Sequence, residues 1–147
     1  RDFTVVIDYA HPPDGLENIC RTLRECCQGR LMTVFGCGGD RDRTKRPKMG
    51  AVAAALSDYL VVTSDNPRSE EPVAIIEDIL AGLQGTKTPY TVVENRVEAI
   101  HWAIAHARPG DIVLLAGKGH ETHQVLKDEV IHLDEREVVA DALAALQ

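Results

Sequence analysis

Residues 111–121 read DIVLLAGKGHE, an apolar run that leads directly into a loop of glycine, lysine, histidine and glutamate. A short run that is apolar on both faces is typical of a strand that is buried on both sides of a sheet. Three further runs have the same character, at residues 3–8 (FTVVID), 31–35 (LMTVF) and 59–63 (YLVVT). The segments between them are long enough for the crossover helices that parallel strands require.

Helical periodicity fills these intervening segments. Asp14 and Glu17 have the spacing of a capping box, and apolar residues then recur every three or four positions until Gly29. Further helices are predicted from about Pro47 through residues 51–56, over residues 72–83 with Ser69 as cap, from Asn95 with Glu98, and from Asp134 with Glu137.

Strands that alternate with helices of about a dozen residues predict an α/β domain. We expect a Rossmann-like, doubly wound and mostly parallel sheet flanked by helices, with a further short strand at residues 90–93. Residues 124–133 alternate like a hairpin around Lys127 and Asp128, and we expect them to add an antiparallel edge to the sheet. Residues 1–147 correspond to one domain.

The composition excludes several classes of protein. Hydrophobic residues make up 44% of the chain and no run approaches the roughly 18 apolar residues of a membrane span. The net charge of -7 argues against a general binder of nucleic-acid phosphates. The four cysteines lack metal-ligand spacing, and Cys20 and Cys27 fall on the apolar side of a predicted helix, so we expect buried, reduced thiols, a cytoplasmic location and no metal site. Because the chain starts without methionine and runs at once into a strand, we expect a piece of a longer protein.

Four loops follow the carboxyl ends of the predicted strands, where ligands bind in such sheets. Each loop alone has a structural explanation as a turn or a helix cap, and the basic run at residues 41–48 could be a solvated surface loop. Their convergence on one rim favours a binding site. The loops are residues 8–14 (DYAHPPD), 36–43 (GCGGDRDR), 64–68 (SDNPR) and 117–121 (GKGHE), and each carries residues that a plain connector would not need.

Two nucleotide-binding motifs are missing from the sequence. There is no G-x-x-x-x-G-K-[ST] phosphate loop, and no G-x-G-x-x-G follows the first strand. A nicotinamide or flavin enzyme is therefore not expected. If the chain takes part in ATP chemistry, another domain must hold most of the triphosphate.

Taken together, the four loops resemble a known set. Residues 8–19 (DYAHPPDGLENI), 29–50 (GRLMTVFGCGGDRDRTKRPKMG), 64–72 (SDNPRSEEP) and 114–124 (LLAGKGHETHQ) are similar to the C-terminal domain of Mur ligases. The similarity is to the members that add meso-diaminopimelate to UDP-N-acetylmuramoyl-L-alanyl-D-glutamate, and it covers essentially the whole chain. The chain differs from that pattern at Pro12, where threonine is usual.

The resemblance implies a three-domain enzyme of peptidoglycan precursor synthesis in the cytoplasm. Its first domain would hold the UDP-sugar, and its central domain would carry the phosphate loop, ATP and Mg²⁺. Both would be partners of the present domain, which would bind neither nucleic acid nor membrane. ATP would phosphorylate the D-glutamate γ-carboxylate, and the diaminopimelate amine would attack the acyl phosphate. No catalytic residue and no metal ligand is expected in this domain, which alone would be inactive.

The resemblance also implies roles for individual residues. The diaminopimelate-binding positions correspond to Arg41, Asp65, Asn66, Pro67, Arg68, Gly117 and Glu121, and the positions facing the nucleotide ribose and base correspond to Asp8, Tyr9, His11 and Asp14. A guanidinium binds a carboxylate with two parallel hydrogen bonds, which suits Arg68 and favours diaminopimelate over lysine. Asp65 and Glu121 suit ammonium groups, and Asn66 offers a donor and an acceptor.

Two alternatives stay open at this point. One is a related ligase domain that adds lysine, or that of a cyanophycin or folylpolyglutamate synthetase. The other is a free-standing α/β module that binds a nucleotide or an anion without a catalytic partner.

Overall fold

The computed structural model describes residues 2–146. Its strands are β1 (Thr4–Asp8), β2 (Leu31–Phe35), β3 (Tyr59–Val62), β4 (Tyr90–Val92), β5 (Ile112–Ala116), β6 (His123–Val125) and β7 (Val130–His132). Its helices are α1 (Pro13–Cys26), α2 (Lys45–Leu56), α3 (Pro72–Ala81), α4 (Arg96–His106) and α5 (Glu135–Ala145).

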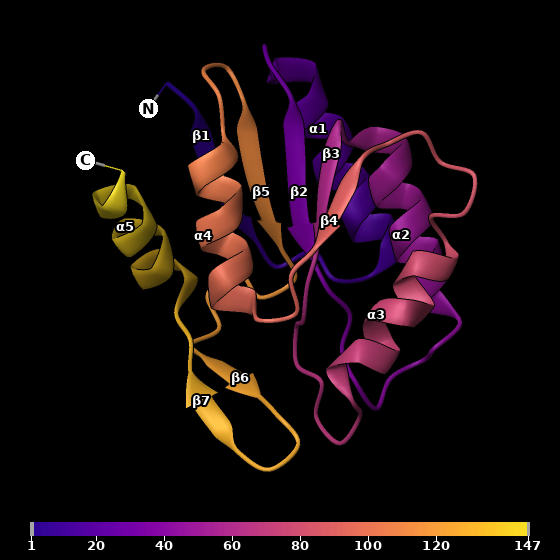
Figure 1. The fold of residues 1–147 in the computed structure, drawn as a ribbon. Coiled ribbons are helices and arrows are strands. Elements are labelled where there is room, and N and C mark those ends of the chain that lie inside the picture. The colour runs from indigo at the N-terminus through magenta and orange to yellow at the C-terminus, as the bar shows by residue number, and fades with distance from the viewer. Residues whose placement is uncertain (1, 147) are drawn as a thin grey trace.

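Five strands form one parallel sheet in the order β1-β5-β2-β3-β4, which confirms the predicted α/β fold. Helices α1, α2 and α3 cover one face, and α4 and α5 cover the other (Figure 1). All five residues of β2 and of β5 are buried, because each strand is covered on both sides. None of the helices formed by residues 2–146 is long and apolar enough to cross a membrane.

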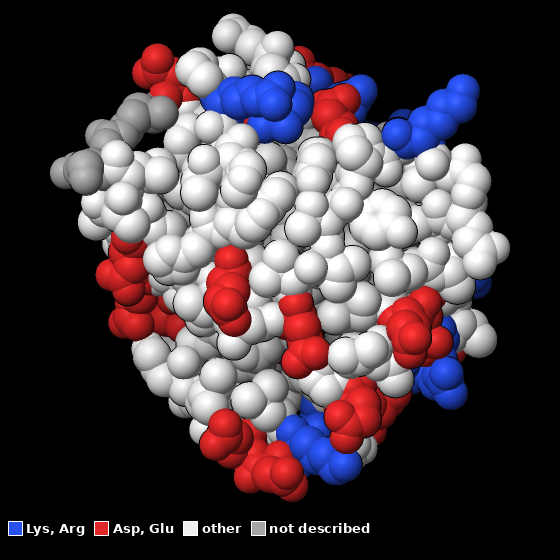
Figure 2. Space-filling model, in the orientation of Figure 1, with Lys and Arg blue, Asp and Glu red and all other residues white. Residues whose placement is uncertain are grey.

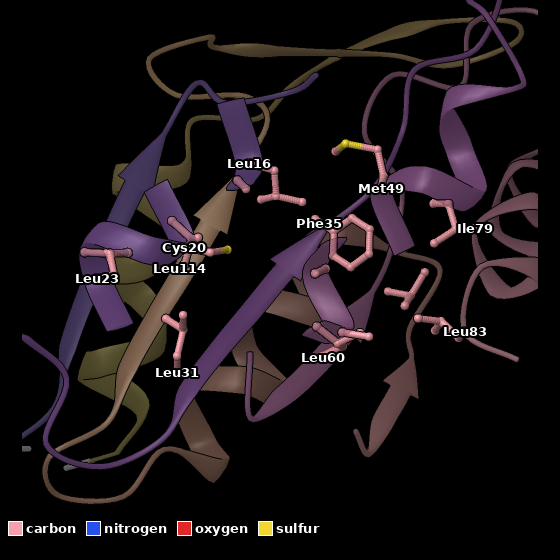
Figure 3. Close-up of a cluster of buried hydrophobic side chains, with 14 of the residues drawn as sticks. Leu16, Cys20, Leu23, Leu31, Phe35, Met49, Leu60, Ile79, Leu83 and Leu114 are labelled. Carbon is pink, nitrogen blue, oxygen red and sulfur yellow. The ribbon is translucent and has the colours of Figure 1, made fainter. Parts of the chain in front are cut away.

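Alternate strand residues supply the two cores. Leu31 and Phe35 pack under α1 to α3, together with Leu114 of β5 (Figure 3). Met32 and Val34, which point the other way, pack against α4 and α5. A period of two in side-chain direction thus turns a continuous apolar run into two separate packed layers.

The predicted hairpin is confirmed, but its predicted place is wrong. Strands β6 and β7 pair only with each other, in a separate two-stranded sheet, instead of adding an edge to the main sheet. The hairpin attaches to the turn after β3, where the Val125 carbonyl accepts from the Arg68 amide at 3.0 Å. The Gln124 side chain donates to the Asp65 carbonyl at 2.7 Å. These bonds place β6 beside the site loops, below the sheet in Figure 1.

Two predicted helix caps are also wrong. Helix α1 has Pro12 as N-cap with proline at its first position, so Asp14 lies inside the first turn and not at the cap. Proline suits this position because the missing N–H would have no partner there. Ser69 does not cap α3, since its hydroxyl donates to Asp40 at 2.5 Å. The predicted cap Asn95 is confirmed, and its side chain accepts from the Glu98 amide.

The start of α5 and the state of the cysteines were also predicted from the sequence. Asp134 caps α5 by accepting from the Arg136 amide, while the Glu137 carboxylate contacts His132 instead of the cap. All four cysteines are free thiols. Of the two cysteines expected on the apolar side of the first helix, Cys20 is buried and Cys27 is half-buried, while Cys26 is exposed.

Candidate functional site

A cleft of about 360 Å³ opens at the carboxyl ends of β1, β2, β3 and β5. In Figure 1 the arrows of β2 and β5 end at the lower side of the sheet. Figure 2, in the same orientation, shows basic and acidic side chains close together at the lower end of the molecule. Of the predicted diaminopimelate-binding residues, the cleft wall includes Arg41, Asp65, Asn66, Arg68, Gly117 and Glu121. Of the predicted nucleotide-facing residues, it includes Tyr9 and His11. Residues Asp8, Asp14 and Pro67 do not line it.

Arg68 is fixed in place by two loops. Its φ of 53° lies in the left-handed region, which a residue with a side chain rarely adopts and which often marks functional sites. The backbone amide is held by the hairpin, and Nη1 donates to the Gly39 carbonyl at 2.9 Å. The side chain is half-buried on the cleft wall. One guanidinium edge therefore remains for a ligand, in an orientation set before the ligand arrives.

Gly39 is the point where the loop after β2 meets the turn after β3. Its amide donates to the Asn66 carbonyl at 2.7 Å. A Cβ at Gly39 would lie 1.7 Å from the Pro67 carbonyl oxygen, so only glycine fits. Pro67 thus shapes the backbone contact, which explains why it lies behind the cleft wall and not on it. Arg41 is exposed at the rim, where its Nη1 donates to the Asp40 carbonyl.

Asn66 and the two carboxylates converge on a lysine. The ammonium of Lys118 donates to Asn66 Oδ1 at 3.0 Å and to Glu121 Oε1 at 3.3 Å, and it lies 3.7 Å from Asp65 Oδ1. The Lys118 side chain has no exposed surface. Asn66 Oδ1 also accepts from the Val125 amide at 3.0 Å. The predicted acceptor of Asn66 is therefore already occupied, and its amide nitrogen has no hydrogen-bond partner among residues 2–146.

The glycines of the loop after β5 allow close approach. Gly117 has a φ of 114°, and a Cβ there would lie 3.0 Å from Asp65 Oδ2. Its amide donates to the Asp8 carbonyl at 3.0 Å, which joins this loop to the one after β1. The Asp8 carboxylate turns back to accept from the Ala10 amide at 2.9 Å, so it shapes its own loop.

Tyr9 and His11 form an exposed aromatic wall on the far side of the cleft. Their rings meet edge to face with centroids 4.7 Å apart, and His120 stands 6.3 Å from Tyr9. Tyr9 keeps 49% of its surface exposed. An exposed ring pair suits stacking on a flat ligand group. Asp14 is exposed in the first turn of α1, away from this wall.

Sequence reasoning missed Arg46, which is buried beside the basic loop. Its guanidinium contacts Glu70 with two hydrogen bonds of 3.0 and 2.7 Å, Asp78 at 3.0 Å and the Gly38 carbonyl at 3.1 Å. Hydrogen bonds from Arg46 and from the Asp40 amide hold the pKa of Glu70 below its usual range. The basic run at residues 41–48 thus contains one buried residue that ties the loop after β2 to α3.

Sequence reasoning also missed the pair of Arg96 and Glu135. Arg96 Nε donates to Glu135 Oε2 at 2.6 Å, and its other nitrogens donate to the Ser64 and Ala116 carbonyls at 2.9 Å each. Burial alone would lower the pKa of Arg96, but the adjacent Glu135 carboxylate outweighs it and the pKa is raised. The signal was present in the sequence, because Arg96 has helical spacing to the apolar Ala99.

The side chains on the cleft wall are suited to binding a zwitterion. Arg68, Arg41 and the free amide nitrogen of Asn66 offer donors to a carboxylate, and Asp65 and Glu121 offer oxygens to an ammonium. The one thiol on the cleft wall is Cys37, among the residues that the structure describes. Burial raises its pKa to about 12, which makes it a poor nucleophile.

Comparison with known proteins shows the family of the chain. The family model described as "Mur ligase, glutamate ligase domain" matches residues 1–119. The chain is 57% identical over 144 residues to a UDP-N-acetylmuramoyl-L-alanyl-D-glutamate–2,6-diaminopimelate ligase of Syntrophomonas wolfei, covering 97% of this chain and 29% of that protein. It is 56% identical over 146 residues to the corresponding ligase 1 of Clostridium acetobutylicum, covering 99% of this chain and 30% of that protein.

Solved structures of similar fold also belong to ligases of this kind. A structure of a UDP-N-acetylmuramoyl-L-alanyl-D-glutamate–2,6-diaminopimelate ligase superposes with a TM-score of 0.93 at 39% identity, over 99% of this chain and 30% of that one. A single domain of a putative ligase from Haemophilus ducreyi shares the fold at 17% identity with a TM-score of 0.63, over 99% of this chain and 93% of that one. The chain spans about three tenths of the length of the curated relatives named above. With its family model matched over residues 1–119, the chain belongs to the Mur ligase family, as a glutamate ligase domain.

Proposed function

We propose that the chain is the amino-acid-binding, C-terminal domain of a three-domain, ATP-dependent ligase in the cytoplasm. The whole enzyme would add meso-diaminopimelate to UDP-N-acetylmuramoyl-L-alanyl-D-glutamate in peptidoglycan precursor synthesis. Relatives above 50% identity that carry this name support the proposal, and the chain spans about three tenths of their length. An N-terminal UDP-substrate domain and a central ATPase domain would be its partners.

The observation that carries the proposal is the fixed guanidinium of Arg68 beside the free donor of Asn66 in one cleft. Diaminopimelate presents a reacting amine at one end, and a carboxylate with an ammonium at the other. Arg68 and Asn66 would bind the distal carboxylate, with Arg41 as a second cation. Asp65 and Glu121 would bind the ammonium, and Gly117 would let the backbone approach the ligand.

The role of this domain in catalysis would be positioning. The whole enzyme would form an acyl phosphate from ATP, and holding the amine against it converts a bimolecular step into an effectively intramolecular one. Residues 2–146 contain no group of three or more His, Cys, Asp or Glu that could hold a metal ion, and the sequence has no phosphate loop. The residues present therefore do not fit Mg²⁺ or a triphosphate, which belong to the central domain in this proposal.

The exposed wall of Tyr9 and His11 would contact the ribose and base side of the nucleotide held by the central domain. The exposed rings of Tyr9 and His11 support this part of the proposal, because a base can stack on an exposed ring. Asp8 would act through the shape of the same loop, since its carboxylate is engaged with Ala10. Asp14 would contact the nucleotide from outside the cleft.

Isothermal titration tests the proposal on the full-length protein. Diaminopimelate and lysine are titrated separately, each in the presence of a non-hydrolysable ATP analogue and the UDP-substrate. Diaminopimelate is expected to bind at least about tenfold more tightly, because lysine leaves Arg68 without its carboxylate partner. Equal affinities would favour a lysine-adding ligase. Binding of neither amino acid, with nucleotide binding retained, would favour a free-standing module.

A further inference from the structure

Lys118 is buried under the cleft floor although it belongs to a loop. Its side chain has no exposed surface, and lysine is almost never buried unless its charge is paired. The ammonium donates to Asn66 and Glu121 and forms an ion pair of 3.7 Å with Asp65, so its partners come from two loops. A lysine that only shaped its own loop would not need a partner from the turn after β3.

The contacts of Asn66 Oδ1 determine which way its amide faces. Both groups that reach this atom, the Lys118 ammonium and the Val125 amide, are donors without any acceptor capacity. Only the oxygen of the asparagine amide can accept both. The Asn66 amide nitrogen has no hydrogen-bond partner among residues 2–146 and is not sealed from solvent. Because Asn66 lines the cleft, this nitrogen is a donor left for a ligand.

Lys118 also sets the charge of the cleft wall. Asp65 and Glu121 both line the cleft, and together they would place two negative charges near the position where a carboxylate must bind. The buried ammonium lies within 4 Å of both carboxylates and offsets one of these charges. Without it, the wall would repel an anionic group that approaches Arg68.

We propose that Lys118 is a positioning and specificity-determining residue. Its ammonium holds the Asn66 amide with nitrogen toward the cleft, so that this wall recognises a carboxylate of the amino-acid substrate and rejects an analogue without it. The inference rests on the proposed function, and it assigns Lys118 no contact with substrate. A purely structural buried lysine would instead affect stability and all substrates alike.

The test compares variants of the full-length ligase in steady-state kinetics. Lys118→Met removes the charge with little change in volume, and it is expected to raise the KM for diaminopimelate at least about tenfold. The KM for ATP should stay within about twofold, because no ATP-binding group is altered. The preference for diaminopimelate over lysine should fall by at least about tenfold. Lys127→Met, the same change at an exposed lysine of the hairpin, serves as matched control and should leave all values unchanged.

Coupling between the two residues is measured with Asn66→Ala and the double variant. Because Lys118 acts in part through Asn66, the loss toward diaminopimelate in the double variant should be clearly smaller than the sum of the two single losses. Fully additive losses, or an equal rise in KM for every substrate, would overturn the inference. A wild-type enzyme that does not use diaminopimelate would refute the proposed function itself. A wild type that uses it, with an unchanged Lys118→Met variant, would overturn only the role of Lys118.

A second variant covers the case in which Lys118→Met does not fold. Asn66→Asp keeps one oxygen for Lys118 and Val125 but replaces the donor that faces the cleft by an acceptor. It should retain the thermal unfolding midpoint of the wild type and raise the KM for diaminopimelate at least about tenfold. An unchanged KM in this folded variant would contradict the assigned orientation of the amide.

Discussion

Arg96 and Glu135 form an ion pair of 2.6 Å in which neither side chain has any exposed surface. The pair joins the first turns of α4 and α5, and Arg96 reaches from there to the Ser64 and Ala116 carbonyls. These carbonyls directly precede the turn of Asp65 and the loop of Gly117. The two loops that carry most of the site are therefore held at a fixed separation by one guanidinium, from behind the cleft.

Arg96→Met should destabilise the domain strongly. It leaves the Glu135 charge buried without a partner, which typically costs about 3–5 kcal/mol in the free energy of unfolding. Urea unfolding of the 147-residue chain measures this value. Arg21→Ala is the control, because the exposed pair of Arg21 and Glu17 should contribute well under about 1 kcal/mol. The double variant Arg96→Met/Glu135→Met should be more stable than Arg96→Met. A loss no larger than that of Arg21→Ala would contradict this account.

Gly39→Ala should disrupt the contact between two site loops. The new Cβ would meet the Pro67 carbonyl, which is backbone and cannot move aside without opening the turn that carries Arg68. Gly38→Ala is a matched comparison, because its Cβ would meet only side-chain atoms, the nearest being Arg68 Nη1 at 2.8 Å, and would disturb one side-chain hydrogen bond without displacing backbone. We expect Gly39→Ala to lose at least about 1–3 kcal/mol of stability and Gly38→Ala to remain near wild type. Equal thermal unfolding midpoints for the two variants would count against the loop pairing.

Asp111 should make stability depend on pH in the acid range. Burial raises the pKa of this carboxyl, but hydrogen bonds from the Arg30 side chain and from the Arg30 and Arg108 amides outweigh it, so the pKa is lowered. Because the folded pKa lies below the unfolded value of about 3.9, the stabilisation is present above that value and is lost as the pH falls through the folded pKa. Urea unfolding at pH 7 and pH 3 should show a smaller acid loss in Asp111→Asn than in the wild type. An identical loss of stability at pH 3 in both proteins would show that Asp111 does not cause the pH dependence.

Thiol labelling should separate Cys37 from Cys26. Burial raises the pKa of the Cys37 thiol to about 12, so only about one in ten thousand of these groups is thiolate at pH 8. Cys26 is exposed at the end of α1. Mass spectrometry after iodoacetamide treatment of the folded chain should find Cys26 modified long before Cys37. Faster labelling of Cys37 would show that the cleft wall opens to solvent.

The sequence was sufficient to predict the sheet and the rim because both follow from local signals. The run at residues 112–116 is apolar at every position, and the turn of Asp65 to Arg68 begins where such a run ends. Carboxyl ends of parallel strands share one edge, so the loops could be placed together before their contacts were known. The hairpin was placed wrongly because its attachment runs through Asn66 and Arg68, which are distant in the chain.

The supporting contacts could not be predicted for a different reason. The sequence around Arg46 and Lys118 does not distinguish them from exposed basic residues. Only the three-dimensional structure shows that both side chains are buried. The orientation of the Asn66 amide depends on two donors, Lys118 and Val125, both more than fifty residues away in the sequence. Local periodicity carries no information about such partners.

The central claim is that Arg68 binds the distal carboxylate of diaminopimelate, and one ratio tests it most directly. That ratio is the kcat/KM for diaminopimelate divided by the kcat/KM for lysine, measured in the full-length ligase with and without Arg68→Ala. The account predicts that the substitution lowers this ratio by about tenfold to a hundredfold, while the KM values for ATP and the UDP-substrate change little. An unchanged ratio, with all three substrates weakened equally, would contradict it.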